Sequence, residues 1–209
     1  MQNQLTNEIY NRLNTLFENA ACELNFSNNF ELLVAVMLSA QCTDKRVNEV
    51  TKTLFSKYKS PEDLKVADQA ELEREIFSCG FYHNKAKNLI AMSNDLCKRF
   101  GGKVPDDFDD LISLAGVGRK TANVVLAVGF NQDAIAVDTH VFRVSNRLGL
   151  VKTNNVLKCE LELQKITDKS KWSTFHHQLV LFGRYHCKAI NPKCNGCVLK
   201  DLCKNYKGK

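Results

Sequence analysis

Strong helix breakers are scarce in this chain, and they stand where helices are expected to begin or end. Glycine and proline supply 13 of the 209 residues, 10 and 3 respectively. Such a sequence favours long helices over a turn-rich β architecture. Ser60-Pro61 has the order of an N-cap followed by proline at the first helical position, and Asp68 begins a helix expected to end at Gly80. We therefore predict an all-α fold of about ten helices without a credible sheet.

Hydropathy and composition exclude several classes of protein. The longest apolar stretch, 30–40, contains Glu31 and is about half of the ~20 residues that a membrane span needs. The N-terminus lacks the basic start and apolar core of a signal peptide. With 44% hydrophobic and 25% charged residues, the chain is neither disordered nor collagen-like. We expect a soluble cytoplasmic protein that does not enter the membrane.

Charge is unevenly distributed along the chain. Residues 1–132 carry 15 Lys and Arg against 17 Asp and Glu, whereas residues 133–209 carry 14 against 6. A basic surface on one part of a fold usually binds a polyanion, either nucleic acid or an anionic membrane. An excess of lysine also serves solubility, so charge alone leaves the partner open.

The nine cysteines form two groups. Cys187, Cys194, Cys197 and Cys203 fall within 17 residues, with six, two and five residues between them. Four thiolates in a compact loop suit either zinc or an iron–sulfur cluster, and two disulfides are a poor alternative in a cytoplasmic chain. The isolated cysteines are interpreted as reduced, mostly buried hydrophobic residues: Cys22, Cys42, Cys79, Cys97 and Cys159.

Gly116-Val117-Gly118 separates two predicted helices, 107–114 and 119–128. Glycine lets the backbone adopt positive φ and lets another backbone approach closely. The turn is expected to expose main-chain N–H groups at the start of the second helix, where they can bind a phosphate oxygen without reading sequence. Val117 would anchor the turn in the core. Many such Gly-x-Gly segments are plain turns.

Lys120 lies in the first turn of this second helix, beside Arg119. The positive end of the helix dipole and the neighbouring cation both favour a neutral amine over an ammonium. A neutral amine is the form that attacks an electrophilic carbon to make a Schiff base. A lysine that only contacts phosphate is the alternative, and sequence position does not separate the two.

Asp138 precedes Thr139-His140 and has the position of an N-cap for a helix over 139–148. The same carboxylate could also take a proton from Lys120 and stabilise positive charge on a sugar. The spacing of 18 residues between them permits proximity without requiring it.

Further stretches complete a recognisable pattern. They are 30–36, Ser39-Ala40-Gln41, Thr43-Asp44, 136–140 and Gly183-Arg184-Tyr185. Together with 116–125 and the four late cysteines, they extend over most of the chain. The pattern resembles the endonuclease III family, bifunctional DNA glycosylases and abasic-site (AP) lyases of base excision repair that contain a helix-hairpin-helix motif and an iron–sulfur cluster.

The resemblance implies two helical domains with a DNA-binding cleft between them. A six-helix barrel over 22–132 contains the helix-hairpin-helix at about 108–130. A discontinuous domain of 1–21 and 133–209 carries a [4Fe-4S] cluster on the loop 187–203. The implied ligands are Cys187, Cys194, Cys197 and Cys203. The implied partner is double-stranded DNA containing damaged pyrimidines or abasic sites, bound by a monomeric protein at the nucleoid.

The resemblance also implies the chemistry. An oxidised or ring-saturated pyrimidine is flipped out of the duplex. Lys120 attacks C1′ with Asp138 as its essential partner, the base leaves, and β-elimination through the imine breaks the 3′ phosphodiester. The implied DNA-binding residues are Gln41, which fills the hole in the stack, Phe81, which wedges the opposite strand, His140, and the hairpin residues Gly116, Val117, Gly118, Arg119 and Thr121.

Two positions depart from the residues usual in that family. Phe81 stands where leucine is usual; phenylalanine is a competent wedge, and a core aromatic is the alternative. Cys42 stands where alanine is common and would add a thiol near the DNA. His176, His177 and His186 are interpreted as structural, and Trp172 as a core residue.

Three other functions remain open at this point. An adenine-mismatch glycosylase would share the hairpin and the cysteine spacing but lack the nucleophilic lysine. A noncatalytic helix-hairpin-helix protein would only bind DNA. A zinc-dependent DNA-binding module would use the four cysteines without iron.

Overall fold

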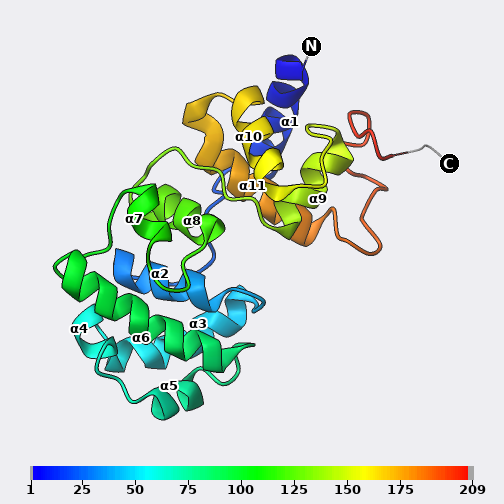
Figure 1. Cartoon of the computed structure of the whole chain (residues 1–209). Helices are drawn as coiled ribbons and strands as arrows, with labels where there is room; N and C mark the ends of the chain where they lie inside the picture. The colour runs from blue at the N-terminus through cyan, green and yellow to red at the C-terminus, as the bar shows by residue number, and fades with distance from the viewer. Residues whose placement is uncertain (1, 207–209) are drawn as a thin grey trace. The chain divides into compact units, whose positions relative to one another are not determined.

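The computed structural model describes residues 2–206, and every regular element within that range is helical (Figure 1). The expected all-α class is confirmed. The elements are α1 (Gln2–Leu16), α2 (Asn29–Leu38), α3 (Asp44–Lys57), α4 (Pro61–Leu64), α5 (Gln69–Glu75), α6 (Tyr82–Arg99), α7 (Phe108–Ile112), α8 (Arg119–Gly129), α9 (Thr139–Leu148), α10 (Val156–Ile166), the 3₁₀ helix η1 (Lys169–Lys171) and α11 (Trp172–Tyr185).

The chain divides into two compact units. The first, Glu23–Asn131, is called the hairpin unit and contains α2 to α8. The second, Met1–Cys22 with Gln132–Lys209, is called the cysteine-loop unit and contains α1 and α9 to α11. Within residues 2–206, no helix is long and apolar enough to span a bilayer.

The hairpin unit is built around α2, which packs against α3, α6 and α8. Eight of the ten residues of α2 are buried, from Phe30 to Leu38 with Glu31 as the partly exposed member. A helix that is apolar on all sides must be enclosed by its neighbours, because leaving any face in water would forfeit about 25 cal/mol for each Å² exposed.

Local capping signals fix where the helices of this unit begin. The side chain of Asn28 accepts a hydrogen bond from the Glu31 backbone N–H at 2.9 Å. Ser60 is an N-cap with Pro61 at the first helical position, as the sequence predicts, and Asp63 completes a reciprocal capping box with Ser60. Each cap satisfies backbone N–H groups that the helix itself leaves unpaired.

The helix expected from Asp68 to Gly80 is shorter than predicted and ends at Glu75. The following residues form turns in which Ile76 and Cys79 are fully buried, and the Cys79 N–H donates to the Ile76 carbonyl at 2.8 Å. The chain then reaches Phe81, whose left-handed φ of 60° is incompatible with a continuous α-helix. Burial of two side chains in the turn therefore overrides the helical propensity.

The cysteine-loop unit has its own apolar core, which α1, α9 and α11 share. Leu13, Val144 and Phe175 represent the three helices in that core and are fully buried. Gly183 lets α11 approach α9 closely, because a Cβ at that position would lie 2.8 Å from the Cβ of His140. Trp172 packs on the core while partly exposed, and its indole N–H donates to the Thr167 carbonyl at 3.0 Å.

All nine cysteines are free thiols in the structure. Of the isolated ones, Cys79 and Cys159 are fully buried, as expected. Cys22, Cys42 and Cys97 are partly exposed, so the expectation of mostly buried hydrophobic residues was too strong for these three.

Candidate functional site

The turn between α7 and α8 needs glycine at position 116, for both conformation and space, but not at position 118. Gly116 has a φ of 74°, and a Cβ there would lie 2.7 Å from the Asn88 Cβ on α6. Val117 is only 5% exposed and anchors the turn, as expected. Gly118 is extended, and a Cβ there would meet no atom within 4 Å. The expectation of positive φ holds for Gly116, whereas Gly118 leaves the surface before α8 bare.

The N-terminus of α8 is open to an external partner. Its N-cap, Gly118, makes no side-chain capping hydrogen bond, and the first turn contains no acidic residue. The Arg119 guanidinium lies 4.7 Å from the centre of the Phe108 ring, against α7. Unpaired N–H groups at the positive end of a helix dipole form a binding site for a phosphate oxygen.

Lys120 and Thr121 occupy the first turn of α8. The Lys120 side chain is exposed, and no hydrogen bond or ion pair to it is found within residues 2–206. Its amine is therefore accessible to a substrate rather than committed to the fold.

Asp138 is the N-cap of α9, as the sequence predicts. Its Oδ1 accepts a hydrogen bond from the Val141 backbone N–H at 2.7 Å, which holds the partly exposed carboxylate in one orientation. This contact uses one carboxylate oxygen. The capping role and a chemical role are therefore compatible in the same side chain.

His140, two residues further along, belongs to a network centred on Arg143. The guanidinium of Arg143 lies 3.2 Å from His140 Nδ1 and donates to the Gly183 carbonyl at 2.8 Å and the Cys187 carbonyl at 3.1 Å. Arg143 therefore ties the start of α9 to the end of α11 and to the first of the four late cysteines. Sequence reasoning did not identify this arginine.

Gln41 and Phe81 lie on two turns that touch. Both have left-handed backbones, with φ of 54° and 60°. The Gln41 carbonyl oxygen lies 3.5 Å from the point that a Cβ on Gly80 would occupy. Phe81 is 63% exposed, which excludes the core-aromatic alternative.

Buried Lys85 holds the first of these turns. Its Nζ donates to the Leu38 carbonyl at 2.8 Å and the Ala40 carbonyl at 2.7 Å, so a cation on α6 caps the C-terminus of α2. Burial lowers the pKa of Lys85. Its place in an ordinary amphipathic helix gave no sequence signal for this role.

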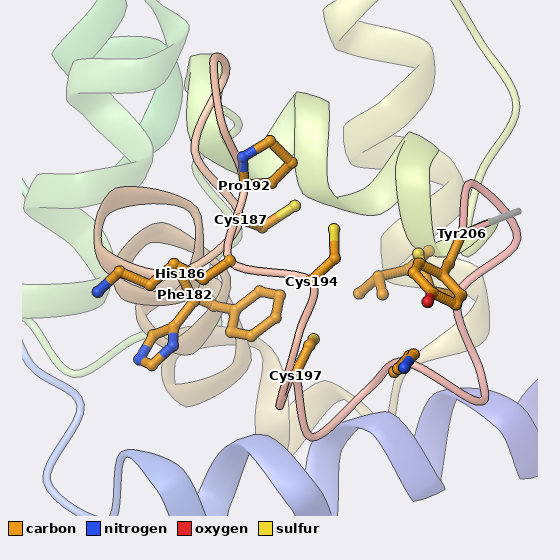
Figure 2. Close-up of a pocket in the computed structure, with 11 residues that line it drawn as sticks. Phe182, His186, Cys187, Pro192, Cys194, Cys197 and Tyr206 are labelled. Atoms are coloured by element: carbon orange, nitrogen blue, oxygen red, sulfur yellow. The ribbon is translucent and has the colours of Figure 1, made fainter. Parts of the chain in front are cut away.

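The four late cysteines line one small cavity, together with Phe182, His186 and Pro192 (Figure 2). In Figure 2 the sulfur atoms of Cys187 and Cys194 project toward the same space. Within residues 2–206, no three His, Cys, Asp or Glu side chains converge tightly enough to hold a single metal ion. Four thiols around one cavity supply the soft ligand set that a cubane iron–sulfur cluster requires.

Arg147 holds the loop that carries these thiols. Its guanidinium donates to the Lys188 carbonyl at 2.7 Å and the Ala189 carbonyl at 3.0 Å, and lies 3.5 Å from the Cys187 sulfur. Arg143 and Arg147 are four residues apart on α9 and so lie on one face of that helix. The residues present therefore fit an iron–sulfur cluster.

The histidines near this loop are structural, as interpreted from sequence. His176 and His177 are buried in α11, and the His177 Nδ1 lies 2.8 Å from the Ser173 carbonyl oxygen. His186 stacks on Phe182 with ring centres 5.7 Å apart. None of them joins a group of metal ligands in the part of the chain that the structure describes.

Comparison with known proteins agrees with this geometry. Residues 34–169 match the HhH-GPD superfamily of base excision DNA repair proteins, and residues 187–203 match the iron–sulfur binding domain of endonuclease III. Endonuclease III of Bacillus subtilis (strain 168) is 54% identical over 194 residues, which cover 92% of this chain and 89% of that protein. The chain belongs to the endonuclease III family.

Solved structures of endonuclease III bound to DNA share the fold. A trapped endonuclease III–DNA covalent intermediate matches with a TM-score of 0.95 and 49% identity, covering 98% of this chain and 97% of that one. A non-covalent endonuclease III–DNA complex matches with a TM-score of 0.95 and 48% identity, covering 98% and 96%.

Membership of the endonuclease III family gives this chain its general function. It is a DNA-binding base excision repair enzyme, a DNA glycosylase and AP lyase, with a [4Fe-4S] cluster as its cofactor. An adenine-mismatch glycosylase, a noncatalytic DNA-binding protein and a zinc module are not favoured.

Proposed function

We propose that Lys120 is the nucleophile of this enzyme, that Asp138 is its catalytic partner, and that the substrates are oxidised or ring-saturated pyrimidines in double-stranded DNA. The observation that carries the proposal is an exposed lysine in the first turn of α8, directly after the bare Gly118. An endonuclease III that is 49% identical has been trapped covalently on DNA, which supports an amine nucleophile in this family.

The hairpin binds the DNA backbone. A phosphate oxygen accepts hydrogen bonds from backbone N–H groups at the start of α8, where no side chain caps the helix, and Arg119 and Thr121 lie beside it. The absence of a side chain at Gly118 lets the sugar–phosphate chain come close. Because this contact carries no sequence information, it suits an enzyme that must find lesions in any sequence.

Gln41 and Phe81 stabilise the opened duplex. Flipping a base leaves a gap in the stack, and the exposed Phe81 ring wedges into the opposite strand while Gln41 fills the gap. Their two turns are adjacent, so both residues enter the duplex at the same lesion. Gly116 and Val117 keep the hairpin in place, and His140 positions the DNA near Asp138.

The reaction proceeds at the deoxyribose. Neutral Lys120 attacks C1′, and the bond to the damaged base breaks so that its electron pair leaves with the base. Loss of a proton from nitrogen and opening of the sugar ring give an imine between Lys120 and C1′. The imine acidifies the C2′ proton, and its removal expels the 3′ phosphate. The Asp138 carboxylate stabilises positive charge on the sugar and accepts the lysine proton.

The cysteine loop serves DNA binding rather than catalysis. Cys187, Cys194, Cys197 and Cys203 would hold the cluster, which when bound rigidifies the loop so that its lysines meet phosphates. The hairpin unit matches the range of the expected barrel domain and the cysteine-loop unit that of the expected cluster domain, and both units contact the DNA. We further propose that the protein acts as a monomer at the nucleoid in the cytoplasm.

Borohydride trapping on abasic-site DNA tests the nucleophile. The wild-type enzyme is expected to give a covalent adduct, and Lys120→Ala to lose it by at least about three orders of magnitude, because no other amine replaces the nucleophile. Lys98→Ala, an exposed lysine on α6, is the matched control and should trap normally. An undiminished adduct in Lys120→Ala would remove the assignment.

Asp138→Asn tests the partner without removing the cap, because the amide oxygen can still accept the Val141 N–H. We expect base excision to fall by about 10²–10⁴-fold with an unchanged melting temperature. Duplexes containing thymine glycol, 5-hydroxycytosine or 8-oxoguanine define the substrate class. Faster excision of the purine lesion would contradict the pyrimidine assignment.

A further inference from the structure

Cys42 and Cys79 are in side-chain contact at the base of the two turns described above. Cys42 follows Gln41, and Cys79 precedes Gly80-Phe81. The two turns are also adjacent, since the Gln41 carbonyl oxygen lies 3.5 Å from the position that a Cβ on Gly80 would occupy. The two thiols are thus held together by the packing of two separate segments.

The two thiols differ in exposure. Cys79 is fully buried, whereas Cys42 is partly exposed. Burial raises the pKa of Cys79 to about 11, which keeps it a protonated thiol until a partner sulfur is presented. The charges of Lys85 and Arg46 lower the pKa of Cys79, but by less than burial and Cys42 raise it. An oxidant from solvent therefore reaches Cys42 first, with Cys79 behind it.

We propose that Cys42 and Cys79 form a reversible disulfide when the enzyme meets a hydroperoxide, and that this disulfide weakens DNA binding. The Cys42 sulfur attacks a peroxide oxygen, the O–O bond breaks, and the released hydroxide leaves as water with the Cys42 proton, so that Cys42 becomes a sulfenic acid. The Cys79 sulfur then attacks the Cys42 sulfur, the S–O bond breaks, and a second water carries away the Cys79 proton. Overall, two thiols and one hydrogen peroxide give one disulfide and two waters.

The disulfide displaces both turns. Two sulfurs in non-bonded contact must close to about 2.05 Å, which draws the backbones at Cys42 and Cys79 together. Gln41 and Phe81 already have left-handed φ values, and Lys85 holds the turn at Gln41 by hydrogen bonds to two carbonyls. The backbone can therefore adjust little without displacing Gln41 and Phe81. The effect on DNA binding rests on the proposed roles of Gln41 and Phe81, whereas the disulfide itself does not.

The linkage is tested by peptide mapping of the cluster-loaded protein. After treatment with a few equivalents of hydrogen peroxide and blocking of free thiols, trypsin is expected to give peptide 13–45 joined to peptide 75–85. Dithiothreitol should separate them. Because peptide 13–45 also contains Cys22, the variants decide the partner: Cys42→Ser and Cys79→Ser should each abolish the link, whereas Cys22→Ser should keep it. Overoxidation of Cys42 with Cys79 left as a blocked thiol would overturn the proposal.

The consequence is tested by fluorescence anisotropy on a duplex containing a tetrahydrofuran abasic analogue, with the visible absorption of the cluster followed in parallel. Oxidised wild-type protein should bind about tenfold more weakly, with recovery in dithiothreitol and no effect in Cys79→Ser. A linked protein with unchanged affinity would overturn the regulatory claim. Failure of the reduced protein to bind would instead count against the proposed function.

Discussion

The hairpin at 116–118 and the cysteine loop at 187–203 are both short connections that carry function, but different forces hold them. The hairpin is fixed by close packing, through buried Val117 and the close approach of Gly116 to Asn88. The cysteine loop is held by distant side chains, Arg143 and Arg147 on α9 and Arg12 on α1, which donates to the Val198 carbonyl at 2.9 Å. We therefore expect the hairpin to keep its structure when the cluster is lost, whereas the cysteine loop depends on the cluster for its structure.

Removing one cluster ligand should produce the largest difference in stability between the cysteine loop and the hairpin. In Cys194→Ser, iron and the visible absorption should be lost, and the cysteine-loop unit should lose more than about 3 kcal/mol of unfolding free energy, because metal binding there is folding energy. Hydrogen exchange should rise over 187–203 and stay unchanged in α8. Cys97→Ser is the control, and equal loss of protection in both regions would contradict the contrast.

The two hairpin glycines should respond differently to the same substitution. Gly116→Ala adds a methyl at positive φ and against Asn88, so we expect a loss of about 2–3 kcal/mol in urea unfolding. Gly118→Ala meets open space and should change stability by less than about 0.5 kcal/mol. It should nevertheless weaken binding to abasic-analogue DNA about tenfold, since the methyl occupies the phosphate's approach. Similar stabilities for the two variants would argue against the required left-handed turn.

Arg147→Lys isolates the polar support of the cysteine loop. Lysine lacks the planar fork that reaches both the Lys188 and Ala189 carbonyls, so we expect a loss of about 1–3 kcal/mol and faster release of iron to a chelator. Borohydride trapping on abasic DNA under cluster-loaded conditions should change little. Arg74→Lys, an exposed arginine of the hairpin unit, should alter neither measurement.

The smallest expected effect is on how strongly stability falls in acid, and it concerns His177 in the cysteine-loop unit. Burial lowers the pKa of His177 below the ordinary value of 6.5, so the unfolded chain binds a proton that the folded chain refuses. Stability should therefore fall as pH drops below about 6.5, by up to roughly 1.4 kcal/mol per pH unit. His177→Gln should flatten the dependence of the melting temperature between pH 7 and 5.5. An identical slope in both proteins would remove His177 as the cause.

Capping residues and turn glycines made the hairpin unit largely predictable. Asn28 and Ser60 in that unit act as the caps that their sequence contexts indicate, as does Asp138 in the cysteine-loop unit. Capping depends on residues only a few positions apart, so it can be predicted from sequence without knowledge of the fold. The end of α5 was missed because burial of Ile76 and Cys79 depends on what packs against them.

The supporting residues of the candidate site were less accessible to sequence reasoning. Lys85, Arg143 and Arg147 each look like solvated charges on amphipathic helices, but the structure shows them donating to carbonyls 40 or more residues away. Such contacts arise only after distant segments have packed. Nucleophile, carboxylate and cysteines were proposed from motif and family resemblance, while the groups that orient them came from the fold.

Helix α9 serves two ends at once. Asp138 caps its N-terminus, and Arg147 in its last turn donates to the Lys188 carbonyl in the cysteine loop. A ten-residue helix is roughly 15 Å long, a short rigid strut. Anyone grafting the 187–203 segment into another repair scaffold must therefore transplant this strut with both arginines, and any adjustment of its tilt will re-aim the carboxylate at the opposite tip.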